Sequence, residues 1–163
     1  MLKIGLLSDT HAYWDDKYAE YFALCDEIWH AGDIGSPAVL DKLQVIKPVK
    51  AVYGNTDGHL IRSECPKHLR FKAEEVDVWI THIGGYPGKY APEVCPEIFT
   101  NPPQLFICGH SHILKVQYDN TLKLLHINPG AAGQQGFHCV RTLVRFAIEG
   151  KTIKDLEVIE LKD

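Results

Sequence analysis

Two histidines separated by one residue follow a short apolar run at residues 105–108. The run has the length and composition of a buried strand, and Gly109 ends it just before His110 and His112. A buried imidazole needs a hydrogen-bond partner or a metal ion, because water no longer satisfies it. The pair therefore predicts a ligand-binding site at the end of this strand.

The same pattern, an apolar run that ends in polar side chains, occurs four more times. The runs cover residues 2–8, 27–31, 49–53 and 76–80, and the side chains that follow them are Asp9, His11, Asp33, Asn55 and His82. Together with the two histidines above, this set is too large for one metal ion, but it suits two cations that share a bridging carboxylate. Mn²⁺ is the preferred assignment, and the nitrogen and oxygen donors leave Zn²⁺, Fe, Ni²⁺ and Co²⁺ open.

Helices are expected between the first three strands. Residues 17–25 follow the possible caps Asp15 and Asp16, and Ser36 with Pro37 begins a second helix that Pro48 ends. Strands and helices that alternate in this way form parallel strands with right-handed crossovers, so the polar loops should meet at one edge of one sheet. The runs at 76–80 and 105–108 are its fourth and fifth strands. Segments 115–118, 122–128, 142–148 and 152–161 predict antiparallel strands of a second sheet packed on the first.

The composition limits the fold and the partners. A chain of 163 residues with 45% hydrophobic residues is expected to form a single domain over residues 1–163. The net charge of −4 and the scattered Lys and Arg residues argue against a long nucleic acid as partner. We expect a cytoplasmic protein without membrane contact, since no apolar stretch is long enough for a span or a signal segment and the five cysteines form no Cys-x-x-Cys pair. A homo-oligomeric state is compatible with the sequence.

The order of the motifs resembles a known family. Asp9-x-His11, Gly32-Asp33, Gly54-Asn55, Thr81-His82 and Gly109-His110-Ser111-His112 are similar to the motifs of the calcineurin-like metallophosphoesterase superfamily, in particular its small bacterial and archaeal phosphodiesterases. This resemblance implies an α/β fold with two packed β-sheets flanked by helices, a four-layer α/β/β/α sandwich. It implies one metal ion held by Asp9, His11 and His112, and a second held by Asn55, His82 and His110. Asp33 would bridge the two.

Such a binuclear centre predicts a metal-dependent phosphoric ester hydrolase whose small phosphorylated substrate is a phosphodiester rather than a monoester. Two cations lower the pKa of a bridging water, and the hydroxide attacks phosphorus in line, with Asp33 and Asn55 as catalytic ligands. The alternative is a non-catalytic protein-binding scaffold of the same fold, like the retromer subunit, which resembles these enzymes but lacks part of the ligand set. All seven positions are filled here, which favours catalysis.

One position departs from the family pattern. Many members have a histidine directly after the metal-binding asparagine, and that histidine is thought to protonate the leaving group. Thr56 stands there in this chain, although the small bacterial and archaeal subgroup also lacks the histidine. A neutral threonine is a poor general acid, so Asp57, His59 or a metal-bound water are the remaining candidates for this role, with Asp57 as the predicted catalytic residue.

Other residues near the motifs have structural explanations. The glycine-rich loop 84–88 fits the approach of a phosphate and a tight turn equally well. The run Asn128-Pro129-Gly130 is typical of a turn. No motif surrounds the remaining histidines, which are therefore expected on the surface or in the core: His30, His68, His126 and His138.

Overall fold

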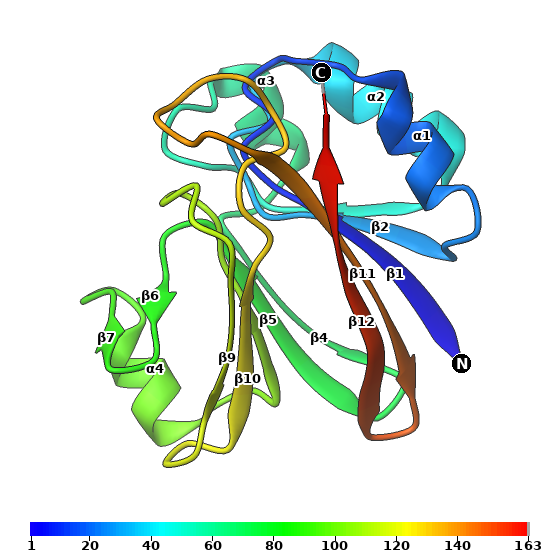
Figure 1. Ribbon diagram of the computed structural model, residues 1–163. Helices are drawn as coiled ribbons and strands as arrows, with labels where there is room; N and C mark the ends of the chain where they lie inside the picture. Colours follow the sequence, from blue (N-terminus) through cyan, green and yellow to red (C-terminus); the bar gives the residue numbers. More distant parts are fainter. Residues whose placement is uncertain (163) are drawn as a thin grey trace.

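Two five-stranded β-sheets are the central layers of the computed structural model, which describes residues 1–162 (Figure 1). The first sheet has the order β12-β11-β1-β2-β3, with strands β1 (Leu2–Leu7), β2 (Glu27–His30), β3 (Val49–Ala51), β11 (Arg141–Glu149) and β12 (Thr152–Leu161). The second has the order β4-β5-β8-β10-β9, with strands β4 (His68–Ala73), β5 (Val76–Thr81), β8 (Leu105–Ile107), β9 (Lys115–Asp119) and β10 (Leu124–Asn128). A short hairpin, β6 (Gly85–Tyr86) and β7 (Lys89–Tyr90), stands apart.

The helices cover the outer faces of the two sheets. Helices α1 (Asp16–Phe22) and α2 (Pro37–Ile46) lie beside the first sheet, and α4 (Cys95–Thr100) lies beside the second (Figure 1). A cluster of buried side chains from both sheets, including Trp29, Ile80 and Phe146, fills the space between them. Separate apolar clusters join each sheet to its helices. The predicted α/β/β/α sandwich is therefore confirmed.

Local signals explain where the first two helices begin. The Asp15 carboxylate accepts a hydrogen bond from the backbone N–H of Lys17 at 2.9 Å, and Ser36 Oγ accepts one from the N–H of Ala38 at 3.2 Å. Pro37 occupies the first position of α2, where its missing N–H costs nothing. Helix α1 ends at Phe22, three residues before the predicted end.

The predicted distribution of strands between the sheets is wrong. Strands β5 and β8 do not extend the first sheet. They pair with each other in the second sheet, and β8 also pairs with β10, which runs parallel to it and not antiparallel as expected. The last two strands instead complete the first sheet, because β11 pairs antiparallel with β1. Apolar composition identifies a buried strand, but it carries no information about which strand lies beside it.

Several short elements were not predicted. Strand β4 pairs antiparallel with β5, and its residues alternate between exposed and more buried positions, which is typical of a half-buried strand but lacks the continuous apolar run that predicted the buried strands. Helix α3 (His59–Glu64) and helix α4 are only six residues long. The glycine loop 84–88 forms the β6-β7 hairpin, with Gly85 and Gly88 at φ of 74° and 91°, which supports its interpretation as a turn. Within residues 1–162, no helix has the length and apolar character needed to cross a membrane.

His126 is a histidine of the second sheet whose side chain is almost fully buried. Its exposed fraction is 1%, and its Nδ1 donates a hydrogen bond to the carbonyl oxygen of Phe106 at 3.1 Å. Burial disfavours the charged imidazolium and lowers the pKa of His126 from 6.5 to about 4. His126 is therefore neutral in the folded protein over a range of pH in which it takes up a proton in the unfolded chain.

This difference predicts an acid-dependent loss of stability. As pH falls from 6.5 towards 4, the unfolded state binds a proton that the folded state excludes, so the free energy of unfolding decreases. His126→Phe removes this titration. Between pH 7.5 and pH 5, wild type should lose about 2 kcal/mol more than the variant in urea denaturation of the metal-free protein. The variant also loses the hydrogen bond to Phe106, but this loss is the same at both pH values and cancels when the two pH dependences are compared. Parallel pH profiles of wild type and variant would contradict the prediction.

Candidate metal centre

The predicted ligands lie where strands of both sheets end. Asp9 and His11 follow β1, Asp33 follows β2 and Asn55 follows β3, all in the first sheet, whereas His82 follows β5 and the pair His110 and His112 follows β8 in the second sheet. The structure brings six of them into two groups, Asp9 with His11 and His112, and Asp33 with His82 and His110. In each group the ligand atoms lie within 4.8 Å of one another. Each group takes donors from both sheets.

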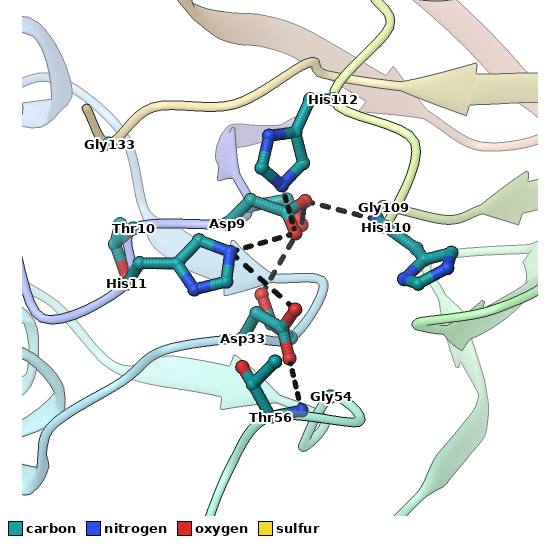
Figure 2. A network of polar contacts seen from close by, with 12 residues as sticks. Asp9, Thr10, His11, Asp33, Gly54, Thr56, Gly109, His110, His112 and Gly133 are labelled. Atoms are coloured by element: carbon teal, nitrogen blue, oxygen red, sulfur yellow. Dashed lines mark hydrogen bonds and ion pairs between the residues drawn. The ribbon is translucent and has the colours of Figure 1, made fainter. Parts of the chain in front are cut away.

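The side chains of the first group converge on Asp9 (Figure 2). His112 Nε2 lies 3.2 Å from Asp9 Oδ1, and His11 Nε2 lies 3.7 Å from the same oxygen. His11 Nε2 is also 3.6 Å from Asp33 Oδ2, which connects the first group with the second. Donor atoms at these separations surround a space that a cation with bonds of about 2.1 Å would fill.

The second group has Asp33 at its centre. His82 Nε2 lies 3.1 Å from Asp33 Oδ2, an ion-pair distance without the alignment of a hydrogen bond. Asn55 Oδ1 lies 3.1 Å from His110 Nδ1, so the seventh predicted ligand joins this group. Because Asp33 Oδ2 faces both His82 and His11, its carboxylate is the group placed between the two clusters.

Three buried donor atoms in these groups lack a hydrogen-bond partner: Asp9 Oδ1, His11 Nε2 and His82 Nε2. A buried polar atom without a partner is costly, so an arrangement of three facing one space indicates that something else satisfies them. Imidazole nitrogens and carboxylate oxygens without thiolate suit a divalent transition-metal ion. The residues present therefore fit the predicted metal pair.

Both carboxylates are ionised at neutral pH. Burial acts to raise the pKa of Asp9, but the neighbouring imidazoles of His11 and His112 outweigh it and hold this pKa well below its usual range. Burial likewise opposes ionisation of Asp33, yet the neighbouring His82 and the N–H of Thr56 lower its pKa to about 2. Asp9 and Asp33 are thus available as anionic ligands.

The backbone of the ligand loops is unusual. Five of the seven predicted ligands have left-handed φ angles of 44° to 71°, namely Asp9, His11, Asp33, His110 and His112. Residues other than glycine rarely adopt this conformation, and such strain gathers at functional sites where the surrounding structure enforces it. Here the backbone N–H of His11 donates to the Asp33 carbonyl at 3.0 Å, and that of Gly133 donates to the Asp9 carbonyl at 3.1 Å.

Two glycines allow the loops to approach the carboxylates. A Cβ at Gly54 would lie 2.1 Å from Asp33 Oδ1, and one at Gly109 would lie 2.8 Å from Asp9 Oδ2. Real side chains do not tolerate such distances, so any larger residue would push the ligand loops apart. The glycine that precedes Asn55 and the one that precedes His110 are therefore required by the site itself.

Asp57 does not fit its predicted role as a proton donor. Its side chain is 3% exposed, and its two oxygens accept hydrogen bonds from three backbone N–H groups, those of Ile34 at 3.1 Å, Gly35 at 2.8 Å and Gly54 at 2.9 Å. Both oxygens are thereby committed to backbone donors and face away from the cleft. Asp57 therefore links the loop that carries Asp33 to the loop that carries Asn55.

A cleft of about 510 Å³ opens onto the metal centre. Its walls are formed by predicted ligands, Thr56 and the loop after β10, with the lining residues His11, Asp33, Asn55, Thr56, His110, Ser111, His112, Ile113, Gln135, Gly136, Phe137 and His138. His138 was not predicted to belong to the site, because it lies 26 residues after His112 without a motif around it. Only the folded chain reveals that their Nδ1 atoms are 3.3 Å apart.

Two other features of the sequence take structural roles. Asn128 Nδ2 donates to the Gly109 carbonyl at 2.9 Å, and Asn128 Oδ1 accepts from the N–H of Gly130 at 3.0 Å, so this turn supports the loop of the two histidines. Trp14, which follows the loop of Asp9 and His11, packs edge-on against Tyr18.

Solved structures with the same architecture cover almost the whole chain. An archaeal phosphodiesterase is 23% identical, with a TM-score of 0.78 over 98% of this chain and 100% of its own. Vacuolar protein sorting 29 from Cryptosporidium parvum is 20% identical, with a TM-score of 0.79 over 99% and 92%. Vps29 from Entamoeba histolytica complexed with Zn²⁺ is 14% identical, with a TM-score of 0.74 over 98% and 99%. At these identities the likeness establishes the fold alone.

Sequence similarity identifies the family. A probable metallophosphoesterase from Methanothermobacter thermautotrophicus is 31% identical over 135 residues, which are 78% of this chain and 76% of that protein. Residues 2–151 match the family model of the calcineurin-like phosphoesterase superfamily domain, a range that contains every predicted metal ligand. The two donor groups lie where strands of the two packed sheets end. On the evidence of the sequence match, the chain belongs to the calcineurin-like phosphoesterase superfamily.

Proposed function

We propose that this protein is a hydrolase that uses two divalent transition-metal ions, Mn²⁺ in the first instance, to cleave a small phosphodiester. The observation that carries the proposal is the pair of donor groups joined by Asp33, in which buried atoms without hydrogen-bond partners face a common space. Membership of a metallophosphoesterase family supports the metal-dependent phosphoesterase activity. The similarity to an archaeal phosphodiesterase supports the choice of a diester.

The residues of the chain have distinct tasks in this reaction. Two bound ions would activate a water molecule and neutralise charge on the phosphoryl oxygens. Asp33 would be shared by both ions, since its Oδ2 faces both groups while its Oδ1 accepts a hydrogen bond from the Thr56 N–H at 3.0 Å. Asn55 would complete the second group from the edge of the cleft, where a neutral amide adds a ligand without adding charge.

In the part of the chain that the structure describes, the cleft offers no evident side chain to protonate the leaving group. Among the described residues that line the cleft, His138 is the one acidic or imidazole side chain that is not a predicted ligand. Both of its ring nitrogens are engaged in hydrogen bonds. Thr56 is not an acid, and Asp57 faces the backbone instead of the cleft. Substrates whose leaving group departs without a proton are therefore favoured.

We predict that the protein cleaves bis(p-nitrophenyl) phosphate in the presence of Mn²⁺ and turns over simple alkyl phosphate monoesters slowly. The reason is that nitrophenolate is a good leaving group, whereas an alkoxide needs a proton that the cleft does not supply. Initial rates for a panel of phosphoesters, each with Mn²⁺, Zn²⁺, Ni²⁺ or Co²⁺, provide the measurement. Chelator-treated protein is the control, and faster turnover of an alkyl monoester than of the activated diester would contradict the prediction.

A protein-binding scaffold of the same fold is the second candidate, because two of the structural relatives are Vps29 proteins. The complete set of seven ligand positions favours catalysis over this alternative. The same assay separates the two. A correctly folded protein that binds two metal ions and hydrolyses no ester of the panel would favour the scaffold.

A further inference from the structure

His138 lies directly behind His112, on the side of the ring opposite to Asp9. The two Nδ1 atoms are 3.3 Å apart, and the rings meet nearly edge-on, with centroids separated by 5.2 Å. His112 points its other nitrogen, Nε2, towards Asp9 Oδ1 at 3.2 Å, as the labelled ring in Figure 2 shows. One imidazole thus stands between a predicted metal position and a second imidazole.

The hydrogen-bond partners decide which nitrogens carry protons. His138 Nε2 lies 2.8 Å from the carbonyl oxygen of Gly133, which only accepts, so Nε2 of His138 is the protonated nitrogen. In the neutral ring, its Nδ1 is then an acceptor, and the donor facing it is the Nδ1–H of His112. A proton on Nδ1 leaves the Nε2 lone pair of His112 pointing towards the Asp9 carboxylate, an arrangement that a metal ion between the two atoms would stabilise.

A second ligand of the centre is held in the same way. His82 Nδ1 donates to the carbonyl oxygen of Ala31 at 2.7 Å, which leaves its Nε2 without a hydrogen-bond partner beside Asp33. The partner of His82 is a backbone group, whereas the partner of His112 is a side chain that can be replaced. This difference makes the role of His138 open to experiment.

The loop that carries His138 is shaped around the His112 ring. At Gly136, whose φ is +127°, a Cβ would lie 2.3 Å from His112 Nδ1. The backbone N–H of Gly133 also donates to the Asp9 carbonyl at 3.1 Å. A closed circuit of contacts results, from Asp9 through Gly133 and His138 to His112 and back to Asp9.

We propose that His138 is a positioning residue that fixes the tautomer and orientation of His112 for the metal ion of the first group. The inference deepens the proposed function, because it rests on the metal-binding role assigned to His112. It concerns one ion only, since the described contacts of His138 are with His112 and Gly133 and with no residue of the second group. Partners of this kind change metal affinity about ten- to a hundredfold when they are removed.

His138→Phe keeps a ring of similar size and removes both polar atoms, whereas His138→Asn places a carbonyl oxygen near the former Nδ1. His138→Gln retains reach towards Gly133 without that acceptor, and it serves as a second variant if the phenylalanine protein does not fold. Gln134→Ala in the same exposed loop and His68→Phe on β4 are the matched controls. Circular dichroism checks the fold of each protein.

The first measurement is the ¹⁵N–¹H correlation spectrum of the histidine rings in metal-free protein, at a pH where His112 is neutral. The Asp9 carboxylate, 3.2 Å from Nε2, favours a proton on that nitrogen, whereas His138 Nδ1 favours one on Nδ1. We therefore expect a larger Nδ1–H population of His112 in wild type and His138→Asn than in His138→Phe and His138→Gln. A tautomer population of His112 that is the same in all four proteins would overturn the inference.

The second measurement is calorimetric titration of the metal-free proteins with Mn²⁺. Wild type and the controls should bind two ions, and His138→Phe should bind one of them about tenfold or more weakly while the other affinity is unchanged. Unchanged affinity for both ions in that variant overturns the inference and leaves the proposed function standing. Failure of wild type to bind metal overturns the proposed function, and the ring spectra then decide separately whether His138 controls the His112 tautomer.

Discussion

Asp33→Asn is expected to reduce phosphodiester hydrolysis about a thousandfold or more and to weaken the binding of both metal ions. The carboxylate lies between the two groups, 3.6 Å from His11 Nε2 and 3.1 Å from His82 Nε2, so its negative charge serves both. Each ion contributes several kcal/mol to stabilisation of charge in the transition state, and about 1.4 kcal/mol corresponds to a tenfold change in rate. Assays of bis(p-nitrophenyl) phosphate hydrolysis and metal analysis of the purified variant test this result.

Asparagine is chosen because it keeps the shape of the side chain and an oxygen that accepts from the Thr56 N–H. Asp41→Asn, the same change at an exposed position of α2, is the control and should behave as wild type. Wild-type activity in Asp33→Asn with two bound ions would contradict the assignment of Asp33 as the shared ligand.

His110→Ala and His112→Ala are expected to lose different metal ions, one each. His112 belongs to the group of Asp9 and His11, and His110 belongs to the group of Asp33 and His82, although only one residue separates them in sequence. Their positive φ angles of 71° and 62° turn the two side chains towards different groups. Metal analysis should therefore give about one ion per chain in each variant.

Paramagnetic Co²⁺ identifies which ion remains. In His112→Ala the retained ion should give contact-shifted ring signals of His82, and in His110→Ala those of His11, because contact shifts reach only rings that are bonded to the ion. His68→Ala, on the outer strand β4, controls for the loss of an imidazole elsewhere and should retain both ions. Equal loss of both ions in each variant would show that the two histidines serve a single site.

The positions of the predicted ligands could be read from the sequence because each follows directly after a recognisable strand. A buried strand is a local pattern, and a polar side chain at its end is fixed to within a few residues by the backbone alone. That is why Asp9 after β1 and His82 after β5 were found without knowing how the strands pair. Their roles as metal ligands stay predictions until metal binding is measured.

The pairing of strands could not be read in the same way. The expectation that β5 and β8 extend the first sheet was wrong because both satisfy the pattern of a buried parallel strand in either sheet. The choice depends on the neighbours, β4 beside β5 and β10 beside β8, and β4 was missed because it has alternating residues and no continuous apolar run. Both arrangements bring strand ends together, so the error in topology did not displace the ligands.

The errors within the site have a different origin. Asp57 and His138 both lie in loops, where a residue type says what a side chain is able to do but not which way it faces. Asp57 turned out to accept three backbone N–H groups, and His138 to contact a residue far away in sequence. Contacts of this kind depend on the whole fold and leave no periodic signal.

Each donor group combines residues of both sheets, so an ion bound there would act as a cross-link between the layers of the sandwich. Asp9 comes from the first sheet and its partner His112 from the second, and Asp33 with His82 joins the two sheets in the same way. Ligand binding by a folded state alone adds to the free energy of unfolding. Metal affinity and the spacing of the sheets are therefore linked, and a substitution in the apolar layer between them, at Trp29 for example, would also act on the metal centre.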